Sequence, residues 1–526
     1  FRKRLARETY SQTFLVKVSK KESYNFFCLL STWLTTKQRG LFTMMISFQT
    51  DLCPELPPVF GSKDYRELKA LLCRIDELIL QGRLENVFIQ SFGYRERKTE
   101  HQRKRLLQAF RCTLIRMLFQ LSYRRLSREL GCNHLYQKFC GLLRLDRIDV
   151  PCAKTLERYE KMASSETLRA IVTQLNHAAG LGGDESDVQP LNLAEPVELG
   201  VEYVDATVLK ARVHHPVDWV FLRDAVRTLT LAIVQARKHG ICSRMPKAPQ
   251  EYLCAMNKLC IEMTHARRTA DASKKRKKTL RRMKKLVRVV ENLARGHLLK
   301  LRQQGVNDQM SIAMLFLLEQ KFTVILDQLD GVIHQAHERI IGGRRVNNED
   351  KILSLYDPDI HVIVRGKADA EVEFGNTLFL AEQADGLIVD WHLYKEQAPT
   401  DSRMIPEHMR RMREENGIAL KGMTGDRGFD SAENIRLLGD EIENNLCPRN
   451  LERLEERLQH KEFRQHQTRR AQIEARIAIV MHGFLGNPAY KWGYKNKERL
   501  CAWGILTHNL WVLARLPQQA TQAQAA

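Results

Sequence analysis

Residues 419–431 read ALKGMTGDRGFDS. This pattern predicts a short strand that ends in an acidic turn, because a glycine lies on either side of Asp426 and glycine permits the positive φ angles of a sharp turn. Asp430 or Ser431 can cap the helix that we expect to follow. A carboxylate at the carboxyl end of a strand lies where open α/β sheets bind their ligands. An ordinary Asx turn has the same pattern, so the interpretation depends on whether other carboxylates converge on this place.

Length and charge limit the class of protein. A chain of 526 residues is too long for one compact core, which predicts two or three domains. Lys and Arg number 84 against 62 Asp and Glu, and the net charge of +22 favours a polyanionic partner, nucleic acid before membrane. A soluble basic protein without such a partner is the alternative. The twelve cysteines show neither a Cys-x-x-Cys pair nor zinc-ligand spacing, so we interpret them as reduced thiols of a cytosolic protein.

The first residues of the chain have a different composition. Basic residues precede an apolar run at 26–30, which is far shorter than the roughly 20 apolar residues that span a bilayer. We therefore expect no membrane partner. The chain does not begin with Met, and we expect the start at Met44 or Met45, with residues 1–43 as a non-native extension.

Residues 44–180 form the predicted N-terminal region. Apolar residues at helical spacing predict helices over 64–90, 101–121 and 165–179. Residues 181–195 are rich in Gly and Asp and predict a linker to the next domain.

One segment inside this region has the outline of a helix-turn-helix. Residues 121–139 read LSYRRLSRELGCNHLYQKF, which is a short basic helix, a glycine and a second short helix. The second helix of such a motif enters a major groove of DNA. Arg124, Arg125 and Arg128 would then help to hold the duplex. An ordinary helical hairpin would have the same sequence pattern.

Beyond the linker, aromatic and β-branched residues predict a strand over 197–208, with Asp205 past its middle. A helix is expected over 219–237, with Asp218 as its N-cap. Residues 243–343 are helical and basic. The centre of this segment carries Lys274, Lys275, Arg276, Lys277, Lys278, Arg281, Arg282, Lys284, Lys285 and Arg288. Because the charges cover most sides of one helix, we expect it to lie along a polyanion rather than in a core, with a solvated face as the alternative.

The last third of the chain returns to a sheet pattern. Strands are predicted over 360–364, 374–383 and 387–395, and the Asp-Gly pair at 385–386 is a strong hairpin signal between the last two. A long helix is predicted over 464–481. The order is therefore strand, helical insertion, hairpin, helix, strand and helix.

Taken together, these segments resemble insertion-sequence transposases of the Asp-Asp-Glu (DDE) type and are similar to the bacterial group called ISNCY. Four blocks carry the resemblance: YVDAT (203–207) with HHPVD (214–218), GK (366–367) with EFG (373–375), GDRGF (425–429), and RAQIE (470–474). Each block alone is weak evidence for this family, but four blocks in the family's order are fairly specific for it.

The resemblance implies an α/β catalytic domain with an RNase H-like (retroviral-integrase-like) mixed sheet and helices, interrupted by a helical insertion and preceded by a helical DNA-binding region. Its first part would span residues 196–240 and its remainder 346–516. The basic insertion would span 241–345, and a tail 517–526.

The resemblance also implies the site. Asp205, Asp426 and Glu474 would be the catalytic carboxylates and would hold two Mg²⁺ (or Mn²⁺) ions, which in such sites lie about 3.5–4 Å apart. Arg470 would contact DNA. Glu498 is the alternative third acid. Gln467 and Met481 depart from the related cut-and-paste group, which has Tyr and Lys at these positions, and this departure leaves the activity of this copy in question.

The implied function is that of a DNA transposase, which binds the terminal repeats of an insertion element and catalyses metal-dependent strand cleavage and transfer into target DNA. It would act as a homodimer or larger multimer on double-stranded DNA, in the cytoplasm of a bacterium and on its nucleoid. The alternatives are a catalytically inactive DNA-binding protein derived from a transposase, and a metal-dependent nuclease on the same fold.

Overall fold

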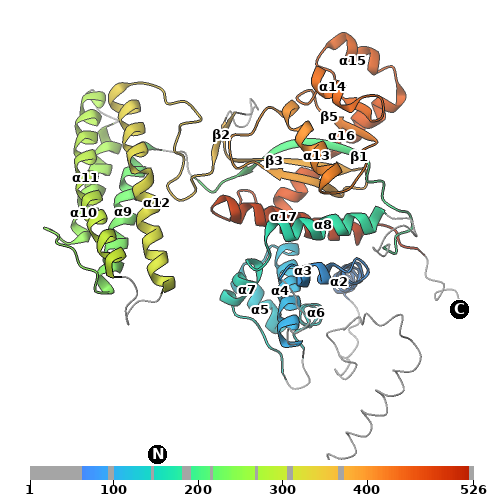
Figure 1. Cartoon of the computed structure of the whole chain (residues 1–526), viewed down its shortest axis with the longest axis horizontal. Coiled ribbons are helices and arrows are strands. Elements are labelled where there is room, and N and C mark those ends of the chain that lie inside the picture. Colours follow the sequence, from blue (N-terminus) through green and yellow to red (C-terminus); the bar gives the residue numbers. More distant parts are fainter. Residues whose placement is uncertain are drawn as a thin grey trace, which may run out of the picture. The chain divides into compact units, whose positions relative to one another are not determined.

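The computed structural model describes residues 62–92, 100–143, 147–180, 191–213, 217–266, 271–304, 312–364 and 372–519. These residues form a mostly helical α/β protein with one six-stranded mixed sheet (Figure 1). The expected extension at 1–43 lies outside the described residues. No helix in the described ranges is long and apolar enough to cross a bilayer. Every described cysteine is free, as expected.

The sheet is built around β1 (Val201–Lys210). One edge of β1 pairs antiparallel with β3 (Val372–Gln383), and the other pairs parallel with β5 (Gly422–Gly425). Two strands, β2 (His361–Val364) and β4 (Ile388–Leu393), pair antiparallel with β3, while β6 (Glu443–Leu446) pairs parallel with β5. The predicted strands are confirmed with shifts of a few residues, whereas β6 was not predicted.

The turn between β3 and β4 confirms the hairpin prediction. Gly386 has a φ of +96°, a conformation that side chains other than glycine rarely adopt. Asp426 follows β5 directly, and the hydroxyl of Ser431 accepts a hydrogen bond from the backbone N–H of Asn434, 3.1 Å away, at the start of α14 (Ala432–Leu438). Of the two candidate residues, Asp430 and Ser431, it is therefore Ser431 that caps α14.

Helices cover both faces of the sheet. On one face, α13 (Ile405–Glu414) packs over a core that includes Val204, Phe379, Met423 and Phe429. The residues of β1 that alternate with Val204 point to the opposite face, where α16 (Lys461–Val480) contacts β1, β5 and β6. The long helix predicted over 464–481 is thus confirmed.

The N-terminal region is helical, as predicted. Its helices are α2 (Lys63–Gln81), α3 (Leu84–Gln90), α4 (Glu100–Leu118), α5 (Tyr123–Cys132), α6 (His134–Phe139), α7 (Ala153–Glu160) and α8 (Ser165–Gly180). The C-terminal helix α17 (Tyr494–Leu513) packs among them, and the ring of Trp503 lies 5.7 Å from that of Phe110. The predicted domain boundaries are not tested by these contacts and stay predictions.

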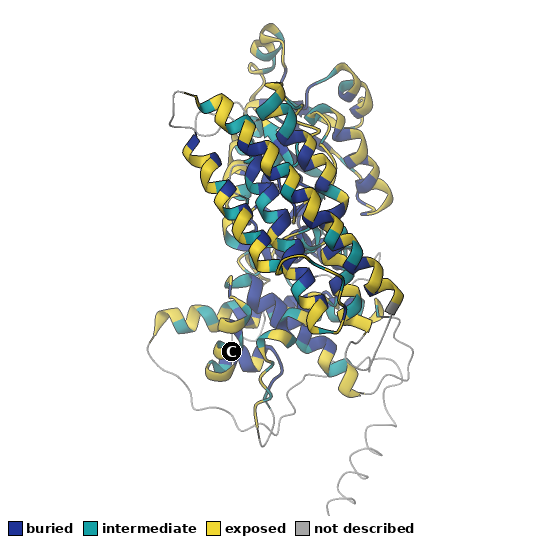
Figure 2. Cartoon of the chain, turned by 90° about the vertical axis from the view of Figure 1, so that its left-hand side faces the viewer, coloured by how far each residue is buried: buried dark blue, intermediate teal, exposed yellow. Residues whose placement is uncertain are grey.

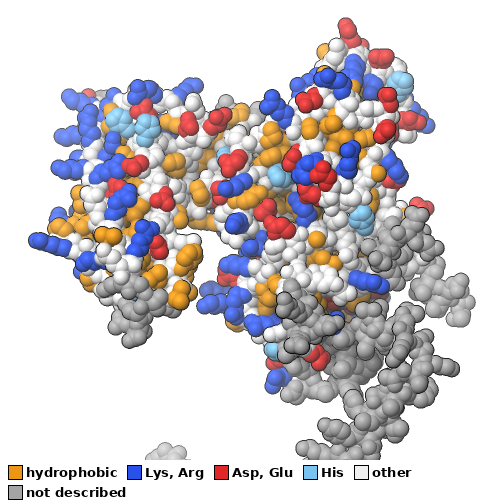
Figure 3. Space-filling view, in the orientation of Figure 1, with side chains coloured by type: hydrophobic (Ala, Val, Ile, Leu, Met, Phe, Trp, Pro, Cys, Tyr) orange, Lys and Arg blue, Asp and Glu red, His pale blue; other side chains and the backbone are white. Residues whose placement is uncertain are grey.

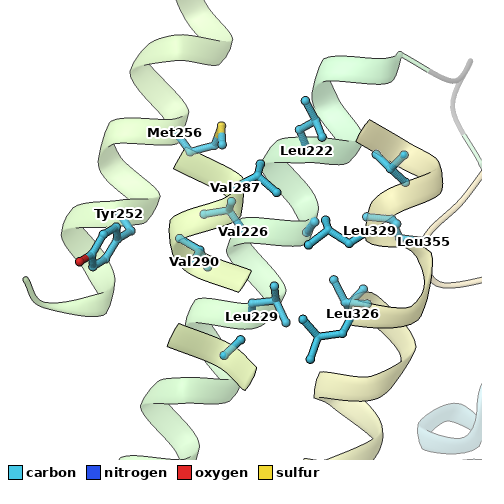
Figure 4. Packing of buried hydrophobic residues seen from close by; sticks show 14 of the residues in the cluster. Leu222, Val226, Leu229, Tyr252, Met256, Val287, Val290, Leu326, Leu329 and Leu355 are labelled. Atoms are coloured by element: carbon cyan, nitrogen blue, oxygen red, sulfur yellow. The ribbon is translucent and has the colours of Figure 1, made fainter. Parts of the chain in front are cut away.

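The segment after β1 forms a bundle of α9 (Asp218–Lys238), α10 (Pro249–His265), α11 (Ala272–Gln304) and α12 (Ile312–His337). Figure 4 shows Val226 of α9, Met256 of α10, Val287 of α11 and Leu326 of α12 pointing into a shared core. The segment 241–345 is mostly helical where it is described, as predicted, and α9, which lies in the predicted first part of the catalytic domain, packs into the same bundle core.

One expectation about α11 is wrong. This basic helix does pack in a core, because Leu280, Met283, Val287, Val290 and Ala294 are fully buried in the bundle. They recur every three or four residues and form a narrow apolar stripe between the charges. The basic side chains lie mostly on the exposed faces of the bundle, which Figure 2 shows in yellow.

The role expected for Asp218 is also wrong. Val217 is the N-cap of α9, and no side chain caps that position. Asp218 is buried instead and accepts hydrogen bonds of 2.9 Å from both Gln335 and Arg339 at the end of α12. A carboxylate at a predicted helix start can therefore serve a distant partner rather than its own helix.

Two phenylalanines on α12 test the bundle core. Phe322 is fully buried, whereas Phe316 is 57% exposed on the same helix. We expect Phe322→Ala to lower the free energy of unfolding of the bundle by about 3–5 kcal/mol through loss of burial and a residual cavity. Phe316→Ala should stay within about 0.5 kcal/mol of the parent. Denaturant unfolding followed by intrinsic tryptophan fluorescence, to which Trp219 of α9 contributes, measures both, and equal effects would contradict this core.

Candidate active site

Asp205 and Asp426 lie on neighbouring parallel strands. The register pairs Tyr203 of β1 with Thr424 of β5, and continuing it by two residues brings Asp205 opposite Asp426. Adjacent strands are about 4.8 Å apart, and residues opposite each other in register point to the same face. Both carboxylates are partly exposed. The pairing itself ends at Tyr203 and Thr424, so the register directs both aspartates to the same end of the sheet, and their approach to each other stays a prediction.

The turn after β5 holds the carboxylate of Asp426. Its Oδ1 accepts a hydrogen bond of 2.8 Å from the backbone N–H of Gly428, an Asx turn, so the ordinary interpretation of the motif is also correct. Asp205 Oδ1 likewise accepts from its neighbour, the N–H of Ala206, at 2.7 Å.

A third carboxylate, missed by the sequence analysis, lies at the same turn. A Cβ on Gly428 would come within 2.6 Å of Asp401 Oδ2 and 3.0 Å of Asp426 Oδ1, so a larger residue there would push these carboxylates aside. Asp401 begins the short 3₁₀ turn Asp401–Arg403 that leads into α13. No spacing rule could have linked it to Asp426, because the contact depends on how α13 packs on the sheet.

Glu474 lies on α16, which covers the face of the sheet that carries Asp205. Gln467 donates a 2.7 Å hydrogen bond to the backbone O of Asn445 on β6, while Arg476 lies against the β3–β4 turn at Gly386. The helix therefore crosses the sheet from β6 toward that turn. Glu474 is exposed and lies two residues before Arg476, toward the hairpin. Its convergence with Asp205 and Asp426 stays a prediction.

The two departures from the related group have defined environments. Gln467 accepts a 3.0 Å hydrogen bond from Arg470 Nε, so Gln467 orients the predicted DNA-contacting arginine. Met481 is buried after the end of α16. The alternative acid Glu498 lies on α17, where it accepts a 3.0 Å hydrogen bond from Ser165 of α8. That contact joins Glu498 to the N-terminal helices.

Within the described ranges, no group of three or more His, Cys, Asp or Glu side chains is arranged to hold a metal ion. The chain was also compared with protein-family models, curated proteins and solved structures, and none of the three comparisons found a match. The candidate site therefore rests on the pair Asp205 and Asp426, with Asp401 beside the second.

A buried ionic cluster lies on the other face of β1, three residues before Asp205. His408 of α13 bridges two carboxylates, at 2.6 Å from Glu202 Oε1 and 2.8 Å from Asp390 Oδ2. Arg411 binds the same Asp390 at 2.7 Å, and Arg169 of α8 binds it at 3.0 Å. Asp390 lies in a strand that is otherwise apolar except for His392, and this was the only sequence signal for the cluster.

The electrostatics of this cluster favour its charged forms. Burial alone would lower the pKa of His408, but Glu202 and Asp390 outweigh it and raise that pKa to about 9. Burial would likewise raise the pKa of Asp390, whereas its bonds to His408 and Arg411 hold it well below its usual range. The cluster ties α13 to β1 and β4, and thereby fixes the strand that carries Asp205.

On the opposite face of the sheet from this cluster, two arginines of α16 contact a buried carboxylate of β3. Arg469 Nη2 lies 2.5 Å from Glu382 Oε1, and Arg476 lies 3.7 Å from the same oxygen. Burial raises the pKa of Glu382, although both arginines oppose that shift. Arg469 also stacks on the ring of Tyr203, whose hydroxyl meets His466 at 3.1 Å. These contacts anchor α16 on the face of β1 that carries Asp205.

The predicted DNA-binding residues are largely accessible. Arg124, Arg125 and Arg128 of α5 are exposed. On α11, Arg282 pairs with Glu262, and Arg288 pairs with Glu291 and Asp330. The described structure shows no ion pair for Lys274, Lys275, Lys278, Arg281 or Lys285, so these charges are the ones left for a partner.

The pH dependence of stability tests the buried cluster. Because the pKa of His408 is raised in the folded protein, its contribution is fully present below the unfolded value of 6.5 and is lost as pH rises through about 9. We expect the free energy of unfolding to fall by about 3 kcal/mol across this window. His408→Gln should abolish the fall and destabilise the protein at neutral pH, whereas His460→Gln, an exposed control, should keep it. A parent without this fall would contradict the assignment.

The salt dependence of DNA binding tests α11. Replacing Lys274, Lys275, Lys277 and Lys278 by Ala should weaken binding to all duplexes alike, and flatten the salt slope by about 0.9 per lost phosphate contact. The double variant at Arg282 and Arg288 is the control, because intramolecular ion pairs already neutralise both. An unchanged slope with intact binding would mean that the basic run is only a solvated surface.

Proposed function

We propose that this chain is a DNA transposase of the DDE type, with an RNase H-like catalytic domain. The observation that supports the proposal is the parallel register of β1 and β5, which ends at Tyr203 and Thr424, two residues before Asp205 and Asp426. These are the two aspartates that the motif resemblance selected. In the proposed site, two segments that are distant in sequence would supply carboxylates at the same end of the sheet.

The connectivity of the sheet supports the same proposal. In an RNase H-like sheet the first strand leads into the next two by antiparallel pairing. Here β1, β3 and β4 pair antiparallel in that order, although more than a hundred residues separate β1 from β3. The bundle α9–α12 occupies that gap and has its own core.

The donor atoms at the site suit a hard divalent cation. Carboxylate oxygens are the protein ligands that Mg²⁺ prefers, and Asp205 and Asp426 would hold it, with Asp401 within reach of the same turn. A bound pair of such ions activates water and stabilises the leaving oxyanion in phosphodiester cleavage. The chain's own residues fix the geometry, since β1 and β5 hold the carboxylates and the buried cluster at His408 holds β1.

The partner would be double-stranded DNA, first the ends of the element and then the target. The net charge of +22 and the exposed Lys and Arg side chains on α5 and α11 support this choice. A multimer on DNA is part of the proposal, because the two ends of an element must be brought together.

Cleavage of element-end DNA tests the proposal. With duplex carrying the sequence that flanks the gene, we expect Mg²⁺-dependent nicking by the parent, and a loss of at least about a hundredfold in Asp205→Asn and Asp426→Asn with binding retained. Asp440→Asn is the matched control, an exposed carboxylate in the turn after α14. Nicking at parental rate by both site variants would overturn the assignment.

The same assay selects the third acid. If Glu474 completes the site, Glu474→Gln should abolish nicking while Glu498→Gln, which alters only the contacts with Ser165 and Tyr494, keeps it. The reverse result would transfer the role to Glu498. Asp401→Asn is a third arm, because Asp401 already lies beside the turn of Asp426.

One observation favours the non-catalytic alternative. No three-ligand group is assembled in the described residues, and Glu474 lies toward the hairpin. A transposase-derived DNA-binding protein would bind element ends without nicking them at any Mg²⁺ or Mn²⁺ concentration. A nuclease on the same fold would nick DNA but would not join the freed 3′ end to a target.

A further inference from the structure

The predicted helix-turn-helix has a second helix that faces the interior. Of the six residues of α6, Leu135, Tyr136, Gln137 and Phe139 are buried, and Gln137 Nε2 donates a 3.0 Å hydrogen bond to the backbone O of Leu130. Lys138 is the one fully exposed side chain of α6. A helix that enters a major groove must present an exposed face to the base edges, and α6 presents only Lys138 with the half-buried His134.

A different helix lies beside α5 with the opposite exposure. Figure 1 shows α7 next to α5, and Ser127 of α5 donates a 2.9 Å hydrogen bond to the backbone O of Pro151, just before α7. Glu160 fixes the other end of α7, because it accepts from Tyr123 of α5 at 2.7 Å and pairs with Arg116 of α4 at 2.5 Å. α7 is therefore held rigidly against α4 and α5.

The exposed side chains of this helix pair are basic and mostly unneutralised. Lys154 and Arg158 are exposed one turn apart on α7, so they lie on the same face. Arg124 and Arg128 have the same spacing on α5. In the described residues, none of these four side chains forms an ion pair, whereas Arg125 pairs with Glu129 and Lys161 with Glu157. Figure 3 shows Lys and Arg side chains gathered over this part of the molecule.

We propose that α5 and α7, rather than α5 and α6, form the surface that binds duplex DNA, with α7 as the helix that enters the major groove. The inference rests on the proposed function and deepens it by assigning the groove-facing helix. Double-stranded DNA is the occupant, because its regularly spaced phosphates complement four unpaired cations on two packed helices. Lys154 and Arg158 are then the side chains closest to the base edges.

Binding to two duplexes tests the assignment. The probes are the sequence that flanks the gene and a shuffled duplex of equal length, each titrated by fluorescence anisotropy at several salt concentrations. Lys154→Ala with Arg158→Ala should weaken binding to the flanking sequence by roughly five- to a hundredfold and reduce its preference over the shuffled duplex. Arg124→Ala with Arg128→Ala should weaken both alike.

Two matched controls separate position from charge. Lys138→Ala removes the exposed basic side chain of α6. Lys161→Ala removes a basic side chain at the C-cap of α7, whose charge Glu157 already balances. Both should bind like the parent. A loss in Lys138→Ala, with Lys154→Ala and Arg158→Ala unaffected, would restore α6 as the groove helix and overturn the inference.

A cysteine at the start of α7 gives an independent readout. Cys152 is exposed, and a hydrogen bond with the Thr155 hydroxyl lowers the pKa of its thiol, which favours alkylation. The flanking duplex should slow alkylation of Cys152 by iodoacetamide but not that of Cys73, which is exposed on α2. Equal rates with and without saturating DNA would contradict a DNA contact at α7.

The experiments distinguish a failure of this inference about α7 from a failure of the proposed function. If the parent nicks the flanking duplex and loses that activity in Asp205→Asn, while the α7 variants bind normally, only the present inference fails. If the parent binds neither duplex, the proposed function fails with it.

Discussion

The backbone of β1 is paired along both of its edges, with β3 on one side and β5 on the other, and the candidate active site depends on this pairing. A slip of one residue against β5 would turn Asp205 to the opposite face from Asp426. The slip is costly because β1 alternates between two kinds of buried contact. Glu202 meets His408 on one face, and Tyr203 stacks under Arg469 on the other. Neither residue has an equivalent partner after a shift.

Such a register is held by charges as much as by apolar packing. Burying Glu202, Asp390 and Glu382 would be costly if any of them were left unpaired. Each instead meets His408 or an arginine from a helix on its own face, so the helices α13 and α16 can pack on the sheet only in the arrangement that satisfies them. The ionic contacts therefore specify how helices meet the sheet, and the apolar core supplies most of the free energy of burial.

Local signals in the sequence predicted much of this fold. The Asp-Gly turn at 385–386, the glycines around Asp426 and the serine cap at Ser431 act within a few residues, and all were found where expected. β6 was missed because ENNL has almost no apolar character and becomes a strand only by pairing with β5. The same holds for the site. Asp205 and Asp426 follow from strand and turn patterns, whereas Asp401 reaches the turn of Asp426, and His408 reaches Glu202 on the other face of β1, only through the packing of α13.

The bundle after β1 shows how a sheet tolerates a large insertion. β1 continues its pairing past Lys210, since the N–H of Ala211 donates to the O of Phe374 at 2.8 Å. The chain then enters α9, and at the far end of the bundle Arg339 and Gln335 return to Asp218 at the start of α9. The chain that leaves β1 and the chain that returns to the sheet share a small apolar core, in which Ala211 packs with Leu353, Ile360 and Val362. Closing so long a loop between β1 and β3 costs conformational entropy, and the apolar core of the bundle offsets that cost. β3 therefore pairs with β1 as if the two strands were adjacent in sequence.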